Sequence, residues 1–112
     1  MSDTQAVRRI EGGFLAPADA RVAIVAARFN DFIVDKLIEG AVDGLTRHGL
    51  PQASTTLART PGAFELPLIT ERLAKSGQFG AVIALGAVIR GSTPHFDYVC
   101  SGVSSGCARV MA

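Results

Sequence analysis

The feature that most constrains the fold is an uninterrupted apolar run, AVIALGAVI, at Ala81 to Ile89. This run is rich in valine and isoleucine and carries no charge, which is typical of a strand buried on both faces of a parallel sheet. The sequence that follows, RGSTPHFD, changes abruptly: Gly91 and Ser92 favour a sharp turn, and Pro94 suits the first turn of a helix. Ligands bind at this carboxyl edge in open α/β sheets, and a helix start there favours an anion such as phosphate.

Two earlier segments show the same order of strand and helix. RVAIVAA, at Arg21 to Ala27, predicts a first strand, and the more polar STTLART, at Ser54 to Thr60, predicts an edge strand. Apolar side chains at helical spacing predict helices at about residues 32–48, 64–75 and 95–112. Three strand–helix units predict right-handed crossovers, a parallel sheet and helices on both of its faces.

The first 20 residues differ from the rest of the chain. They are polar and broken by glycine and proline, which predicts an N-terminal arm at residues 1–20, with Arg8 to Leu15 as a candidate edge strand. Residues 21–112 are predicted to form a single α/β domain.

Composition excludes several classes of protein. The net charge of +1 gives no electrostatic reason to expect a nucleic acid or an anionic membrane as partner. No apolar run approaches membrane-spanning length, and the start MSDTQAVRRIEGG is not that of a signal peptide. Cys100 and Cys107 lie on one predicted helix about 10 Å apart, too far for a disulfide, and show no metal-ligand spacing. We therefore expect a cytoplasmic protein with reduced thiols and no metal.

We call the residues that directly follow a predicted strand its exit. At each of the three exits at least one side chain can be interpreted either as structural or as part of a binding site. Asn30 or Asp31 is expected to cap the first helix, and Phe29 before them is either a hydrophobic staple for that helix or a ring exposed for stacking on a planar ligand. Glu65 is either an acid at a helix start or an acceptor for ligand hydroxyls. His95 is either a surface residue or a proton-transfer group. In the predicted architecture all three exits meet at one edge of the sheet.

Three motifs together, RFNDFIVDKLIEGA, TPGAFELP and GAVIRGSTPHFDYV, closely resemble those of the 6,7-dimethyl-8-ribityllumazine synthase family. The resemblance extends from about Arg21 to the last residue, with the motifs in order. It implies an α/β, flavodoxin-like three-layer sandwich with a parallel sheet, and a homopentamer that in some members builds a hollow icosahedral capsid. It also implies the penultimate step of riboflavin biosynthesis. In that step 5-amino-6-(D-ribitylamino)uracil condenses with 3,4-dihydroxy-2-butanone 4-phosphate, without metal or organic cofactor.

Carried over by position, the resemblance implies ten site residues. Phe29 stacks on the pyrimidine, and Glu65 takes the ribityl hydroxyls. The backbone of residues 87–89 contacts the edge of the pyrimidine. The hydroxyls of Ser92 and Thr93 hold the butanone phosphate, and His95 transfers protons. The full set is Phe29; Ala63, Phe64 and Glu65; Ala87, Val88 and Ile89; and Ser92, Thr93 and His95.

The sequence departs from the family at its end. Family members continue through another strand and further helices, which carry an arginine for the phosphate and an apolar residue for the neighbouring subunit's pocket. We therefore expect the last strand and helices to be missing, and the uncharged third strand to need a neighbour on its outer side. Two alternatives to the enzyme stay open: a non-catalytic module that binds a flavin-like or ribityl ligand, and a structural component of a shell.

Overall fold

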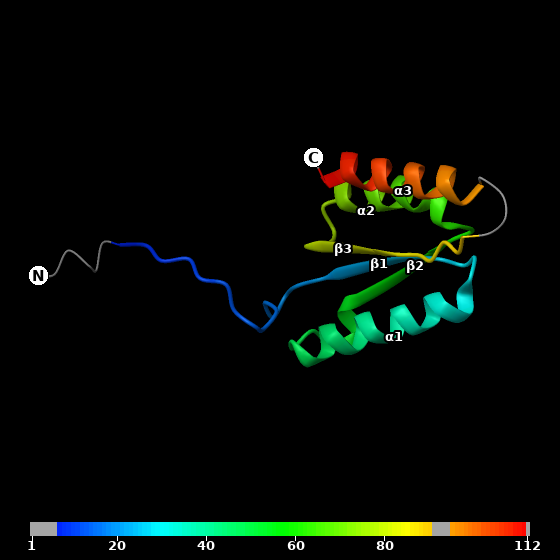
Figure 1. The fold of residues 1–112 in the computed structure, drawn as a ribbon. Helices are drawn as coiled ribbons and strands as arrows, with labels where there is room; N and C mark the ends of the chain where they lie inside the picture. Colours follow the sequence, from blue (N-terminus) through cyan, green and yellow to red (C-terminus); the bar gives the residue numbers. More distant parts are fainter. Residues whose placement is uncertain (1–6, 91–94, 112) are drawn as a thin grey trace, which may run out of the picture.

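The computed structural model describes residues 7–90 and 95–111. In chain order the elements are β1 (Val22–Ala27), α1 (Asp31–Arg47), η2 (Gln52–Ser54), β2 (Thr55–Thr60), η3 (Ala63–Glu65), α2 (Leu66–Lys75), β3 (Ala81–Leu85) and α3 (His95–Met111). The three strands are parallel and lie in the order β2-β1-β3, with α1 on one face of the sheet and α2 and α3 on the other (Figure 1). The predicted arrangement of a parallel sheet with helices on both faces is confirmed.

The central strand is β1, and all six of its residues are buried. It is paired on both sides and covered by helices on both faces, which is why its VAIVAA sequence has no polar position. Its register runs from Val22 opposite Thr55 to Ala27 opposite Thr60 on β2, and continues to Ala26 opposite Leu85 on β3. The three strands therefore end together, and the expected meeting of the three exits at one edge is confirmed.

The third strand differs from its prediction. It was expected to be buried on both faces up to Ile89, but β3 ends at Leu85 and is a half-buried strand at the edge of the sheet, with Ala81 and Ala84 exposed. The reason is its position: β3 pairs with β1 alone among the described strands, whereas β1 has two neighbours. The apolar residues after Leu85 leave the ladder and line the cavity described below.

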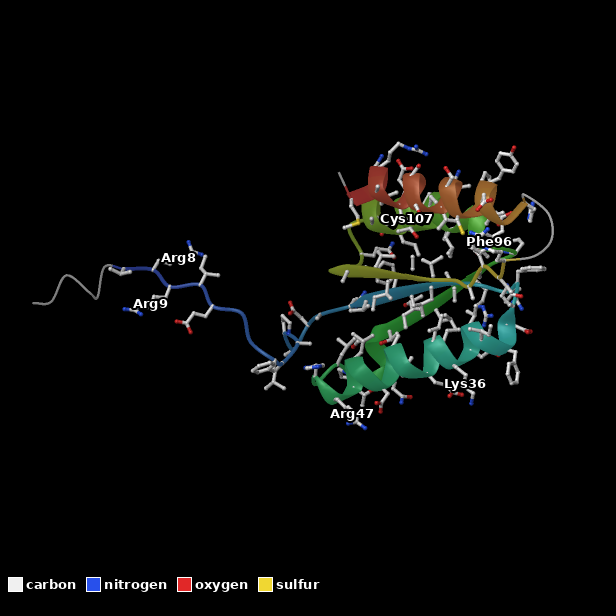
Figure 2. The ribbon with its side chains drawn as sticks, viewed as in Figure 1. Arg8, Arg9, Lys36, Arg47, Phe96 and Cys107 are labelled. Carbon is white, nitrogen blue, oxygen red and sulfur yellow. The ribbon has the colours of Figure 1, made fainter. Side chains whose placement is uncertain are left out.

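The N-terminal arm also differs from its prediction. Residues 8–15 form no strand, so the candidate edge strand is wrong. The arm extends away from the three layers, with Arg8 and Arg9 along it (Figures 1 and 2). Ile10 and Phe14 are more than four-fifths exposed, at 85% and 86%. The arm contacts the domain at the end of α1, where the Ala16 N–H donates to the His48 carbonyl at 2.7 Å. A strand needs a partner, and this segment finds none in the described chain.

Two glycines bring α3 close to the elements beside it. A Cβ atom on Gly106 would lie 2.5 Å from Cγ of Pro67, and one on Gly102 would lie 2.4 Å from Cε2 of Phe64. Real Cβ atoms do not approach so closely, so a larger residue at either position would require its neighbour to move. The Pro67 ring is tied to its own backbone and cannot turn aside, so Gly106 is the stricter requirement, whereas the exposed Phe64 ring has room to turn away from Gly102. Because α3 starts at the edge where the strands end, this packing also sets where its first turn lies.

The helices of the described residues include none that is both long enough and apolar enough to cross a membrane. Cys100 and Cys107 are both free and half-buried.

Candidate functional site

A cavity of about 780 Å³ opens at the carboxyl edge of the sheet. It lies where the three strand exits meet the first turn of α3. Its walls are mostly apolar, with one carboxylate, one imidazole, one phenol and one amide among the side chains. The lining consists of Phe29 and Asn30 after β1, residues 61–65 after β2, residues 87–89 after β3, and His95, Phe96, Tyr98 and Val99 of α3.

The β1 and β2 exits are joined by backbone hydrogen bonds beyond the strands themselves. The N–H of Arg28 donates to the Thr60 carbonyl at 2.7 Å, and the N–H of Phe29 donates to the Pro61 carbonyl at 3.0 Å. Phe29 is held by its backbone, yet 70% of the residue is exposed at the cavity. A side chain packed as a hydrophobic staple would be largely covered, so this exposure favours the interpretation as a ring open to a ligand.

Asn30 does not cap α1 through its side chain, contrary to one of the two caps expected. It occupies the N-cap position, with φ 61° and ψ 42°, but its side chain makes no cap hydrogen bond. The Nδ2 atom instead donates to the carbonyl of Ala87 at 2.8 Å, which links the β1 exit to the β3 exit. Asp31 lies in the first turn of the helix, where an acidic residue complements the helix dipole.

The β2 exit turns through the short helix η3 directly into α2. Ala63 is buried against the core, whereas Phe64 is 60% exposed at the cavity. Glu65 sits at the N-cap position of α2 but makes no side-chain cap bond, and its carboxylate turns back towards Gly62, where a Cβ atom would meet Oε2 at 3.1 Å. Thr60 fixes the turn through a 2.9 Å hydrogen bond from Oγ1 to the Gly62 carbonyl. The carboxylate thus lies at the cavity, at a helix start, as both of its interpretations require.

The β3 exit forms the opposite wall. Ala87 and Val88 are half-buried and Ile89 is exposed. The residue before them, Gly86, lies against the side chain of Leu66. A Cβ atom placed on Gly86 would be 2.9 Å from Cδ1 of Leu66. A larger residue there would displace the buried Leu66 side chain or push this wall away from the core.

The first turn of α3 closes the remaining side. His95 is its first residue, exposed and lining the cavity. Arg90 is turned towards the same turn: its guanidinium lies 4.6 Å from the centroid of the Phe96 ring and 3.5 Å from Oδ1 of Asp97. Figure 2 shows Phe96 at this end of α3. Arg90 is therefore engaged with the first turn of α3.

Eight of the ten predicted site residues line this one cavity, and the other two, Ser92 and Thr93, lie outside the described residues. The sequence did not single out Phe96, Tyr98, Pro61, Gly62 or Val99 as site residues. Tyr98 could have been found, because it follows His95 by three positions and so shares a helix face with it.

This lining can hold a planar polar ligand and move protons. Aromatic rings offer stacking surface, the 87–89 backbone offers donors and acceptors, and Glu65 and His95 offer an acceptor and a proton carrier. Within residues 7–90 and 95–111 no three histidine, cysteine or acidic side chains gather as a metal site would need.

Comparisons with known proteins identify relatives over this whole region. The 6,7-dimethyl-8-ribityllumazine synthase family matches residues 19–112. A protein of that name from Desulfovibrio desulfuricans is 57% identical over 99 residues, which are 88% of this chain and 64% of the relative. Another, from Nitratidesulfovibrio vulgaris, is 54% identical over 104 residues, 93% of this chain and 66% of the relative. The chain thus spans just under two thirds of the length of these relatives.

Proposed function

Because this chain belongs to the 6,7-dimethyl-8-ribityllumazine synthase family, we propose that it carries the substrate site for the reaction its relatives are named for. In this reaction, 5-amino-6-(D-ribitylamino)uracil condenses with 3,4-dihydroxy-2-butanone 4-phosphate to give the lumazine, inorganic phosphate and water. The observation that carries the proposal is that eight of the implied site residues line a single cavity. No metal or organic cofactor takes part in the proposed reaction.

The pyrimidine substrate is assigned to the wall between the β1 and β3 exits. Phe29 offers an aromatic ring that is 70% exposed, and a planar uracil gains both apolar contact and ring geometry by stacking on it. The backbone groups of Ala87, Val88 and Ile89, which line the cavity, are assigned to the edge of the same ring. The ribityl chain extends towards Glu65, whose carboxylate accepts hydrogen bonds from hydroxyls and makes no cap bond of its own.

The butanone phosphate is assigned to the start of α3. Free N–H groups and the positive end of a helix dipole attract a phosphate, and the hydroxyls of Ser92 and Thr93 precede that start in the sequence. His95, at the first position of α3, then lies next to the atoms that react. These assignments place the ketone of one substrate beside the amine of the other.

The proposed reaction depends more on holding the two substrates in position than on activating either of them. The amine of the pyrimidine attacks the ketone and water is lost. Phosphate then leaves, and the second amine closes the ring with loss of a second water. Each step moves a proton, which suits an imidazole near neutral pH, so His95 is assigned that role. Holding two substrates together supplies the larger share of the rate, because an aromatic amine and a ketone condense readily once oriented.

The family also supports proposals about the whole protein. We infer a flavodoxin-like fold, a homopentamer or a shell built of pentamers, and a place in the cytoplasm, all from membership of this family. The three-layer arrangement and the order β2-β1-β3 are compatible with the first of these.

Two measurements test the function. The purified chain is mixed with both substrates, and the product is followed by its lumazine fluorescence; binding of each substrate alone is measured by calorimetry. Product formation faster than the uncatalysed background supports the enzyme. Tight binding of the pyrimidine with no turnover supports the alternative of a binding module, and neither binding nor turnover supports a structural role.

A further inference from the structure

The side-chain amide of Asn30 makes a contact that the strand pairing does not account for. Its Nδ2 atom donates to the carbonyl of Ala87 at 2.8 Å, across 57 residues of sequence, in a partly buried position. Both residues line the cavity. A hydrogen bond between two walls of a cavity fixes their separation, which is what a binding site for a planar ligand needs.

The backbone of the two exits explains why a side chain has to make this link. The β1 and β2 exits stay joined past their strands, through the N–H groups of Arg28 and Phe29. The β1–β3 ladder, in contrast, ends at Ala26 opposite Leu85. Beyond that point the described hydrogen bonds give one connection between the two exits, and it is the bond from Asn30 to Ala87.

The backbone of Asn30 is adapted to this role. Among the described residues it is the one non-glycine with positive φ, at 61°, in the left-handed region. Most residues pay about 1–2 kcal/mol for that conformation, whereas asparagine tolerates it better. The turn lets the chain pass from β1 into α1 within a few residues while the amide reaches across to the β3 exit. Glycine would adopt the same backbone but has no amide to donate.

We propose that Asn30 is a positioning residue: its amide holds the Ala87 carbonyl and so fixes the 87–89 wall opposite Phe29. Its effect on the pyrimidine substrate rests on the proposed function, but its effect on the wall does not. The amide acts through the backbone of the β3 exit, so that the Val88 and Ile89 groups face the cavity in one arrangement before a ligand arrives.

Three variants separate this role from a merely structural one. Asn30→Gly keeps the left-handed turn and removes the amide. Asn30→Asp keeps the size of the side chain, but a carboxylate cannot donate to the Ala87 carbonyl. The control is Asp31→Ala, which changes the neighbouring exposed side chain at the start of α1, outside the cavity lining.

The first measurement needs no substrate. Backbone amide NMR spectra of the purified chain are compared for the wild type and the three variants. We expect both Asn30 variants to shift the Val88 and Ile89 amide signals, and Asp31→Ala to leave them in place. Shifts confined to the neighbours of residue 30 in sequence would overturn the proposal.

The second measurement is calorimetric affinity for each substrate separately. We expect both Asn30 variants to bind the pyrimidine about 3- to 10-fold more weakly, the range that one net hydrogen bond supplies, and the phosphate substrate as before. Equal loss for both substrates, together with a lower melting temperature, would make Asn30 a folding residue and overturn the proposal. If the wild type binds neither substrate, the proposed function fails, and the NMR comparison still decides whether Asn30 positions the wall.

Discussion

His95 combines two properties that a proton carrier needs: it is exposed and it lines the cavity. We expect His95→Gln to lower turnover while both substrates still bind. General acid–base groups contribute about 10²–10⁴-fold, and the proposed condensation is facile, so we expect a loss of about 100-fold or less. The control is His48→Gln, because His48 lies at the far end of α1 and outside the cavity lining. Unchanged turnover of His95→Gln at saturating substrates would remove His95 from the mechanism.

Phe29 has a natural control three residues along the chain. Phe32 is 82% exposed, also at the start of α1, but it is not part of the cavity lining. We expect Phe29→Ala to weaken binding of the pyrimidine by about 1–3 kcal/mol through lost apolar contact and ring stacking. The phosphate substrate should lose much less affinity, and Phe32→Ala should change neither. If calorimetry shows both affinities falling equally in Phe29→Ala, the ring supports folding instead.

At the level of single residues, position could be predicted from the sequence but contacts could not. Phe29, Glu65 and His95 were expected near one another because parallel strands in register end at one edge, and the register confirms this. The bond from Asn30 to Ala87 depends on a left-handed backbone and on two exits 57 residues apart. Local rules favour a helix cap for an asparagine at that position, and tertiary structure overrides them.

Gly106 allows α3 to lie close against α2. The Pro67 ring lies 2.5 Å from where a Cβ atom on Gly106 would be, and a proline ring is tied to its own backbone and cannot swing aside. We expect Gly106→Ala to lower the free energy of unfolding by about 1–3 kcal/mol, the usual cost of overpacking, in spite of alanine's better helix propensity.

Gly40 in α1 is the matched control, because nothing lies within 4 Å of a Cβ atom placed there. Gly40→Ala should raise the free energy of unfolding by about 1 kcal/mol through helix propensity alone. Urea unfolding followed by circular dichroism compares the two variants. If Gly106→Ala stabilises the chain as much as Gly40→Ala does, the close approach of α3 to α2 is incorrect.

Within α2, Lys75 Nζ lies 2.6 Å from Glu71 Oε1, one helical turn away. The hydrogen bond from Lys75, with its charge, lowers the pKa of the Glu71 carboxyl below its usual value. A carboxyl group whose pKa is lower in the folded state than in the unfolded state stabilises the fold at any pH above the unfolded-state pKa. That stabilisation is lost as the pH falls through the folded-state pKa. We expect Lys75→Met to raise the pKa of Glu71 in an NMR titration. The pair is solvent-exposed, so the melting temperature should scarcely change.

The bounds of an element could be predicted closely where they depend on the residues of that segment alone. They were predicted less well where they depend on whether another segment pairs with it. The three helices begin and end near their predicted bounds, because apolar spacing, glycine and proline mark them. The third strand was predicted four residues too long, since the apolar cavity wall at 87–89 has the composition of a strand. The arm strand was predicted wrongly because pairing at Arg8 to Leu15 depends on a neighbour that propensity does not reveal.

The molecule as a whole leaves much apolar surface uncovered. The chain measures 70 × 28 × 24 Å, with the arm extending far beyond the layers (Figure 1). Ile10, Phe14 and Leu15 on the arm are each at least three-quarters exposed. Exposed apolar side chains in such numbers are typical of surfaces that contact another chain.

The outer edge of β3 leads to the last prediction. Its sequence, AVIAL, contains no lysine, proline or inward-pointing charge, which are the usual protections of a free strand edge, and β1 is its one partner among the described strands. The other edge strand, β2, carries Arg59 and four threonine or alanine residues. We therefore expect the purified chain to associate at micromolar concentration through β3, and light scattering over a dilution series to give a mass above that of the monomer.

A lysine introduced at one edge of the sheet or the other shows which edge strand, β3 or β2, mediates the association. Ala84 on β3 and Thr56 on β2 are both exposed, so a lysine can replace either without entering the core. Ala84→Lys should shift the population towards monomer, because a lysine on a strand edge opposes pairing with another strand. Thr56→Lys should leave the mass unchanged. A wild-type chain that stays a folded monomer with a cooperative melt over the whole series would contradict the prediction, and equal effects of the two lysines would show that β3 is not the edge that associates.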